Sequence, residues 1–262
     1  MKQFFVIGNR TSKSLSPAIF NYWFAKYKIQ ARYYYIETKE KDFDKTIVKE
    51  LKNKDVFGIN VTIPYKEKII KHLDTLDKHS KYIGAVNCIT NTKYKKKGSN
   101  TDWSGYYKTL PKGFNLKKSN IIIIGYGGAA QAIHYSILKN GAKKIKIFNR
   151  TKKRVKFSNK IKYTLNLKTI NEHLGSSDLI INTAPKNLIK KHDQKKIGKQ
   201  TILSDIVYKP KITTFLKQFP DNKKIFGITM LLEQAILSFK IWFGFAPKVD
   251  KKLLSILNRL IK

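Results

Sequence analysis

A glycine-rich turn near the middle of the sequence has the spacing of a nucleotide-binding motif. Gly125, Gly127 and Ala130 form the pattern G-x-G-x-x-A, directly after the apolar run 121–124 and before a stretch with helical periodicity. In that setting the glycines permit a tight turn and a close approach of the backbone to a pyrophosphate at the helix N-terminus. A glycine turn of purely structural origin is the alternative, and the strand–turn–helix context favours dinucleotide binding.

Cations and hydroxyls gather where the following predicted strand ends. An NAD site usually has Asp or Glu there, ~20 residues past the glycines, to bind the ribose 2′-hydroxyl. This chain instead has Asn149, Arg150, Thr151 and Arg154, although only five of its 54 basic residues are arginines. Guanidiniums would bind a 2′-phosphate that a carboxylate would repel. The segment therefore predicts NADP(H), with two ordinary surface arginines as the alternative.

Small polar side chains stand at turns of the N-terminal part, each near a Gly or Pro at the end of a predicted strand. They are Ser14, Ser16, Asn60, Thr62, Asn87 and the run Asn100-Thr101-Asp102. Each alone is more often a cap or a turn residue. Taken together, they could hydrogen-bond a small polyhydroxy acid.

The elements around these residues alternate between strands and helices. The N-terminal part should contain strands over Phe4–Asn9 and Val56–Ile63 and a helix with Ser16 as N-cap and Pro17 at its first position. Helices are also expected after Pro64 and over about 101–110. This alternation is typical of an α/β domain.

The pattern restarts at the apolar run 121–124, which has the composition of a strand buried on both faces of a parallel sheet. A helix closed by Gly141 follows, and then strands at 145–150, 178–185 and 201–207. We therefore expect a Rossmann domain over 104–227. An N-terminal α/β domain over 1–103 would be completed by 228–262, whose apolar helix returns to it.

The composition limits the other classes of function. The net charge of +37 could indicate nucleic-acid binding, but the excess is almost all lysine and is spread along the chain, so we favour drift in composition. The single cysteine, Cys88, excludes an internal disulfide and favours a reducing compartment. No run approaches the ~20 apolar residues of a membrane span. We expect a soluble cytoplasmic protein with no membrane partner and no dedicated nucleic-acid partner.

Nine sequence blocks, in order along nearly the whole chain, resemble the shikimate dehydrogenase family. They are GNRTSKSLSP, GINVTIPYKE, IGAVNCI, NTDWSGY, GYGGAAQA, FNRTKKR, INTAP, SDIVYKP and GITMLLEQA. The resemblance implies two α/β domains with a cleft between them, an N-terminal domain for substrate and a Rossmann domain for NADP(H). It implies NADPH-dependent reduction of 3-dehydroshikimate to shikimate, a step of aromatic amino-acid and chorismate biosynthesis, by a monomer or homodimer.

The same resemblance implies roles for individual residues. Lys66 and Asp102 would be the catalytic pair, and the substrate would be held by Ser14, Ser16, Asn60, Thr62, Asn87, Tyr208 and Gln234. The cofactor would be bound by Gly125, Gly127, Gly128, Ala129, Asn149, Arg150, Thr151, Arg154, Thr183, Ile206, Gly227 and Met230. An ammonium aimed at a ketone oxygen would stabilise the charge that hydride transfer builds there. No metal is expected, because the five histidines are scattered and Cys88 stands alone.

Two departures from the family pattern affect this assignment. The first block has Arg10 after GN and Lys13 before Ser14, where the family usually has Pro and His, and Glu233 before Gln234 is less usual. The alternatives are a quinate/shikimate dehydrogenase with relaxed cofactor use and a basic nucleic-acid-binding protein on a decayed enzyme fold. The arginines at 150 and 154 oppose the first alternative, and an intact Lys66 and Asp102 oppose the second.

Overall fold

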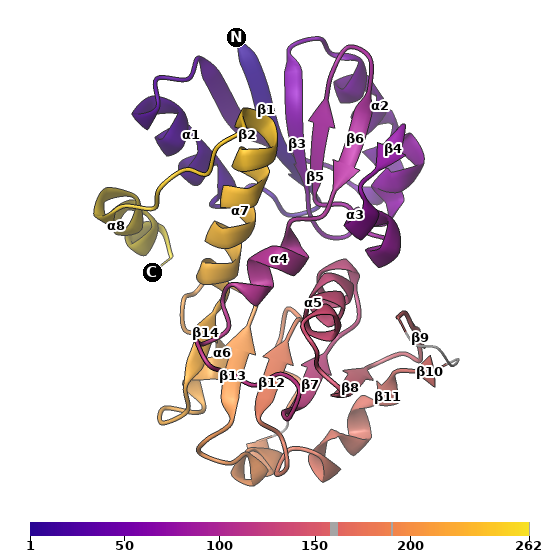
Figure 1. Cartoon of the computed structure of the whole chain (residues 1–262), viewed down its shortest axis with the longest axis vertical. Coiled ribbons are helices and arrows are strands. Elements are labelled where there is room, and N and C mark those ends of the chain that lie inside the picture. Colours follow the sequence, from indigo (N-terminus) through magenta and orange to yellow (C-terminus); the bar gives the residue numbers. More distant parts are fainter. Residues whose placement is uncertain (158–161, 190, 262) are drawn as a thin grey trace. The chain divides into compact units, whose positions relative to one another are not determined.

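The computed structural model describes residues 1–157, 162–189 and 191–261, and it divides into two compact units (Figure 1). Unit 1 comprises Met1–Asp102 with Gln234–Leu260, and unit 2 comprises Trp103–Glu233 with Ile261–Lys262. The boundaries fall inside two helices, α4 (Asp102–Tyr107) and α7 (Gly227–Phe243). Among the described residues, no helix has the length and apolar character needed to span a bilayer.

Unit 1 is built on a mixed sheet of six strands in the order β2-β1-β3-β5-β6-β4. The first three are parallel, β5 is antiparallel to β3 and to β6, and β4 is parallel to β6. The strands are β1 Lys2–Gly8, β2 Ala31–Glu37, β3 Val56–Val61, β4 Thr75–Leu76, β5 Cys88–Asn91 and β6 Lys96–Ser99. This arrangement brings the end of β1, the end of β3, the start of β5 and the end of β6 to one edge.

Both faces of this sheet are covered, because successive strand residues point to opposite faces. Phe5 and Ile7 pack with Phe43 and Ile47 of α2 (Phe43–Lys52). On the other face, Phe4 joins a group of rings that we call the aromatic cluster. Its members come from β1, β2, α1 (Ser16–Lys26) and α7, and they are Phe4, Phe20, Trp23, Phe24, Tyr33, Phe239, Trp242 and Phe243.

Unit 2 is built on a fully parallel sheet in the order β11-β8-β7-β12-β13-β14. Numbered along unit 2, this is the strand order 3-2-1-4-5-6 of a Rossmann fold, as the sequence predicts. The strands are β7 Asn120–Ile124, β8 Lys144–Asn149, β11 Leu165–Asn166, β12 Leu179–Asn182, β13 Ile202–Asp205 and β14 Lys224–Phe226. A separate two-stranded ladder pairs β9 (Arg154–Val155) with β10 (Lys162–Tyr163).

The apolar run of β7 is buried on both sides. Ile121 and Ile123 pack with Ile133 and Ile137 of α5 (Gly128–Lys139), while the alternate isoleucines face a second core with Phe148. Gly141 has φ +98° one residue beyond the C-cap Asn140 and closes α5 as predicted. The remaining helices are α3 Lys78–Ile83, α6 Thr214–Lys217 and α8 Lys251–Leu260, with short 3-10 turns at Glu40–Asp42, Lys68–His72, Leu167–Glu172 and Lys191–Lys196.

Several predicted boundaries differ from the structure. The N-cap of α1 is Leu15, Ser16 is already helical, and no side chain caps this helix. The segment after Pro64 forms a turn and then the 3-10 helix Lys68–His72 rather than an α-helix. The helix expected over 101–110 is confined to Asp102–Tyr107.

Candidate active site

Lys66 and Asp102 form a buried ion pair at the common edge of the unit 1 sheet. The distance from Lys66 Nζ to Asp102 Oδ2 is 2.6 Å, and the two residues are 9% and 4% exposed. Among the described residues Lys66 is the one buried lysine. Its backbone is anchored too, because its carbonyl accepts a hydrogen bond from Val86 N at 2.8 Å. The sequence contains 49 lysines, and composition alone does not distinguish Lys66 from the others. Its burial does.

Asn87 and Thr101 hold the carboxylate of the pair. Asn87 Nδ2 donates to Asp102 Oδ1 at 2.9 Å and to Thr101 Oγ1 at 2.8 Å, and Thr101 N donates to Asn87 Oδ1 at 2.7 Å. Both carboxylate oxygens of Asp102 are therefore engaged. Within the described residues Asp102 is the one hydrogen-bonding partner of the Lys66 ammonium. An ammonium has three hydrogens, so two remain for a ligand.

Helix α7 supplies a second layer to this network. Gln234 Oε1 accepts a hydrogen bond from Asn87 Nδ2 at 3.3 Å, and Ser238 Oγ donates to the carbonyl of Gln234 at 3.0 Å. Ser238 also lies 3.3 Å from Thr101 Oγ1. The sequence prediction did not include Ser238. Its spacing of four residues from Gln234 puts both on one helix face, which is the signal that could have identified it.

Asn60 is engaged inside unit 1. Its Oδ1 accepts a hydrogen bond from Tyr33 Oη at 2.7 Å, and its Nδ2 donates to the carbonyl of Asn87 at 3.0 Å and to Ser238 Oγ at 3.1 Å. Both amide hydrogens are therefore used. Asn60 therefore positions Asn87, and its predicted contact with a substrate hydroxyl stays a prediction.

Ser14, Ser16 and Thr62 lie at the same sheet edge, Ser14 on one loop, Ser16 at the first position of α1 and Thr62 on a second loop. The serines follow β1, Thr62 follows β3, and the two loops are joined by a hydrogen bond from Asn9 N to Ile63 O at 3.2 Å. Ser14 Oγ accepts from Ser16 N at 3.2 Å. In the part of the chain that the structure describes, none of the three hydroxyls donates a hydrogen bond, so each retains a donor for a ligand.

In unit 2, the glycine turn follows β7 at the point where the strand order reverses. Gly125 has φ +94°, and a Cβ there would lie 2.6 Å from Thr183 Oγ1, which hydrogen-bonds the carbonyl of Ile124 at 2.7 Å. A Cβ at Gly127 would meet nothing within 4 Å, and α5 begins without a side-chain cap. Open space over the backbone and the uncapped N–H groups of α5 fit a pyrophosphate.

The predicted 2′-phosphate residues lie between the end of β8, at Asn149, and the start of β9, at Arg154. Asn149 Nδ2 donates to the carbonyl and the hydroxyl of Thr151, at 2.8 and 3.2 Å, and so shapes this turn. Arg150 and Arg154 are exposed, and within residues 1–157, 162–189 and 191–261 neither guanidinium has a hydrogen bond or an ion pair. No carboxylate occupies the turn. These donors fit the 2′-phosphate of NADP(H) better than the 2′-hydroxyl of NAD.

The remaining predicted residues of unit 2 lie in α7, on the loops that follow β12 and β13, and at the start of α5. A Cβ at Gly227 would lie 2.5 Å from the carbonyl oxygens of Ile206 and Val207, so the start of α7 requires glycine. Met230 is 7% exposed and packs in the core beside Ile206. Tyr208 lies half-buried on the loop after β13, Thr183 directly follows β12, and Ala129 is buried at the start of α5.

The sequence prediction did not include Asp205, a buried carboxylate at the end of β13. Its Oδ2 accepts a hydrogen bond from Thr213 Oγ1 at 2.6 Å, and its Oδ1 accepts one from Val207 N at 3.0 Å. Burial raises the pKa of this carboxyl. Asp205 therefore fixes the loop that carries Ile206 and Tyr208, a role set by contacts that no local pattern reveals.

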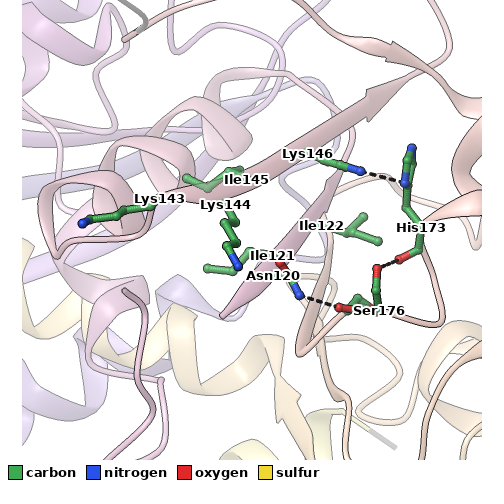
Figure 2. Close-up of a pocket in the computed structure, with 10 residues that line it drawn as sticks. Asn120, Ile121, Ile122, Lys143, Lys144, Ile145, Lys146, His173 and Ser176 are labelled. Atoms are coloured by element: carbon green, nitrogen blue, oxygen red, sulfur yellow. Dashed lines mark hydrogen bonds between the residues drawn. The ribbon is translucent and has the colours of Figure 1, made fainter. Parts of the chain in front are cut away.

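A pocket of about 300 Å³ lies at the opposite end of β7 from the glycine turn (Figure 2). It is lined by Asn120 at the start of β7, by Lys143, Lys144 and Lys146 around the start of β8, and by His173. Ligands of open α/β sheets bind at the carboxyl ends of the strands, so this pocket is separate from the cofactor turn. In the described part of the chain, no three His, Cys, Asp or Glu residues group as metal ligands.

The chain is similar to known proteins along its whole length. Residues 6–89 match the family described as "Shikimate dehydrogenase substrate binding domain", residues 108–226 match "Shikimate / quinate 5-dehydrogenase", and residues 227–251 match "Shikimate 5'-dehydrogenase C-terminal domain".

Individual relatives agree with these matches. Shikimate dehydrogenase (NADP(+)) of Bacillus subtilis is 34% identical, over 99% of this chain and 98% of its own length. The protein of the same name from Clostridium perfringens is 37% identical, over 96% of this chain and 95% of its own. A crystal structure of shikimate dehydrogenase in complex with NADP+ aligns with a TM-score of 0.83 at 29% identity, over 100% of this chain and 96% of the other. The chain therefore belongs to the shikimate dehydrogenase family.

Proposed function

We propose that this protein catalyses the reversible NADPH-dependent reduction of 3-dehydroshikimate to shikimate in aromatic amino-acid biosynthesis. The observation that carries the proposal is the buried Lys66–Asp102 pair, whose ammonium keeps two hydrogens for a ligand. Family membership and the relatives named for NADP-dependent shikimate oxidation support the choice of substrate and cofactor. A cytoplasmic location fits such a biosynthetic enzyme.

The chemistry assigned to the pair follows from its charge and its hydrogens. The bound cofactor supplies the hydride. Lys66 Nζ donates a hydrogen bond to the reacting oxygen, stabilises the negative charge that develops there and transfers a proton to it. Asp102 holds the amine in position and compensates its charge inside a buried site. In the direction of oxidation, the same lysine receives the proton of the hydroxyl group.

The substrate is held by residues of the common sheet edge in unit 1. Ser14 and Ser16 donate their hydroxyl hydrogens to the carboxylate, and Tyr208 of unit 2 assists. Asn60, Thr62, Asn87 and Gln234 bind ring hydroxyls, and Asn60 also keeps Asn87 in place. The match of residues 6–89 to a substrate-binding domain supports unit 1 as the substrate domain.

The cofactor is held by unit 2. The turn of Gly125, Gly127, Gly128 and Ala129 binds the pyrophosphate, and Asn149, Thr151 and the two arginines bind the 2′-phosphate. Thr183, Ile206, Gly227 and Met230 lie along the ribose and nicotinamide. The open space at Gly127 supports this placement, as do the guanidiniums of Arg150 and Arg154, which have no partner among the residues that the structure describes.

The test is an absorbance assay of nicotinamide reduction with four combinations of shikimate or quinate and NADP+ or NAD+. We expect shikimate with NADP+ to be the best pair by kcat/KM. Equal efficiency with NAD+ would contradict the 2′-phosphate assignment, and a preference for quinate would favour the quinate/shikimate alternative. No turnover, together with salt-sensitive binding to DNA or RNA, would favour the nucleic-acid alternative.

A further inference from the structure

Tyr126, the residue between the first two glycines of the turn, is turned into the protein. It is 2% exposed, and its ring packs in the core of unit 2 with residues of β7 and α5. A phenol hydroxyl that is buried needs hydrogen-bonding partners. Two partners of the Tyr126 hydroxyl come from different segments, and neither belongs to the turn.

The first partner is His134, on α5. The distance from Tyr126 Oη to His134 Nδ1 is 3.1 Å, and the hydrogen bond forms with either tautomer of the imidazole, because a phenol both donates and accepts. His134 is 4% exposed. This contact fastens the turn to the helix whose N-terminus it precedes.

The second partner is the segment 153–156, which carries Arg154. Lys156 N donates to Tyr126 Oη at 3.0 Å, and Lys153 Nζ donates to the backbone carbonyl of Tyr126 at 3.4 Å. On its other side, the segment is held by Thr164, whose N donates to Lys153 O at 2.8 Å and whose Oγ1 accepts from Lys153 N at 3.0 Å.

Tyr126 therefore connects the two places where the cofactor's phosphates are assigned. Arg154 and Val155 alternate along β9, and Val155 packs against the core of unit 2 while Arg154 is exposed. Any shift of this short strand relative to the turn would move the Arg154 guanidinium relative to the pyrophosphate. Binding is strongest where such groups are already in position before the ligand arrives.

We propose that Tyr126 is a positioning residue for NADP selectivity, which acts through its hydroxyl by fixing the strand that carries Arg154 against the glycine turn. This inference rests on the proposed function, because it assumes that Arg150 and Arg154 bind the 2′-phosphate. It assigns no contact between Tyr126 and the cofactor.

The experiment compares two small ligands by calorimetry, 2′,5′-ADP and 5′-AMP, which differ by the 2′-phosphate alone. In Tyr126→Phe, we expect the Kd of 2′,5′-ADP to rise roughly three- to tenfold, the effect of losing one hydrogen bond, while the Kd of 5′-AMP stays within about twofold. The KM for NADP+ should rise with kcat unchanged. Tyr106→Phe is the matched control, because Tyr106 is equally buried in unit 2 and hydrogen-bonds Ser204 at 3.2 Å.

Variants of His134 test the same hydrogen bond from its other side, so the inference can still be decided if Tyr126→Phe does not fold. His134→Leu removes the partner and should reproduce the loss of 2′,5′-ADP affinity. His134→Asn places a polar atom at the position of Nδ1 and should restore most of it. Equal losses for both ligands, or no difference between Leu and Asn at position 134, would overturn the inference.

The outcomes separate this inference from the proposed function. If the unchanged protein binds 2′,5′-ADP no more tightly than 5′-AMP, the assignment of the arginines to the 2′-phosphate fails. If the unchanged protein shows that preference and Tyr126→Phe retains it in full, the role of Tyr126 alone fails.

Discussion

Lys66 differs from the other lysines in its surroundings and not in its chemistry. It is buried and paired with an equally buried carboxylate, whereas Lys68, two residues along the chain, is half-exposed and pairs with the exposed Glu40. A buried ion pair is costly to assemble, because both groups lose their hydration. Within the described residues, the hydroxyls of Ser14, Ser16 and Thr62 at the same sheet edge donate no hydrogen bond, so the surroundings of the pair favour a role in chemistry over a role in stability.

Replacing Lys66 by alanine should lower kcat roughly 10²- to 10⁴-fold, because the group acts on the charge and the proton of the transition state. The KM for shikimate should stay within a few-fold. Steady-state kinetics with Lys68→Ala as the control, which should retain normal kcat, would check this. A change in KM alone would make Lys66 a binding residue.

The buried imidazole of His134 makes the free energy of unfolding depend on pH. Burial lowers the pKa of its imidazole from 6.5 to about 4, so the folded protein holds it neutral while the unfolded chain protonates it near pH 6.5. The contribution of His134 to the free energy of unfolding is therefore fully present above pH 6.5. It is lost as the pH falls toward 4, because the unfolded chain then binds a proton that the folded protein does not. The free energy of unfolding should therefore decrease by roughly 2 kcal/mol between pH 7 and pH 4.5 on account of this residue.

Urea denaturation of the unchanged protein and of His134→Asn, at both pH values, would measure that contribution. The difference in unfolding free energy between the two proteins should shrink at the lower pH. A difference that does not depend on pH would show that His134 titrates normally in the folded state.

At the scale of elements, two glycines at helix starts differ in what surrounds them. A Cβ at Gly227 would meet two carbonyl oxygens at 2.5 Å, and a Cβ at Gly127 would meet no atom within 4 Å. Gly227→Ala should therefore reduce stability by about 1–3 kcal/mol through overpacking. Gly127→Ala should cost less than about 1 kcal/mol, a helix-cap effect, but should weaken NADP+ binding because the new methyl occupies ligand space.

Thermal melting and calorimetric titration of both variants would check this contrast. If Gly127→Ala binds NADP+ as tightly as the unchanged protein does, the pyrophosphate does not approach that backbone. If Gly227→Ala melts at the unchanged temperature, α7 can shift away from β13.

The predictable elements were those with a local signal. The run 121–124, the helix ended by Gly141 and the parallel strands of unit 2 follow from periodicity, glycine placement and burial on both faces. The predicted helix starts near Pro64 and Ser16 are less accurate. A turn delays the helix after Pro64, and α1 begins without a side-chain cap, so neither start has a clear sequence signal. The roles of Lys66 and Asp102 came from family resemblance, since nothing in their spacing shows that the two side chains meet.

Other site residues depend on contacts between distant segments. Ser238 reaches Asn60 across 178 positions, and Tyr126 reaches Lys156 across 30. Hydrogen bonds of this kind are created by the fold, so sequence patterns can suggest a polar residue but not its partner.

For the whole molecule, the net charge of +37 creates a field that attracts anions. NADP+ carries one phosphate more than NAD+, so its association should gain more from this field. Raising the salt concentration from roughly 20 to 500 mM shortens the Debye length and should reduce kcat/KM for NADP+ severalfold, and more than for NAD+. Kinetics at a series of salt concentrations would measure this, and an equal fall in kcat would point instead to an effect on folding or on the chemical step.

The aromatic cluster of unit 1 has an optical consequence. It contains Trp23 and Trp242 among rings whose centroids lie as close as 4.4 Å, whereas the third tryptophan, Trp103, is in unit 2 beside Tyr135. Closely packed, asymmetric rings give a strong near-ultraviolet circular dichroism signal that disappears when fixed packing is lost. The two halves of this protein thus carry separate spectroscopic labels, and Trp103→Phe would leave an indole signal that reports on unit 1 alone.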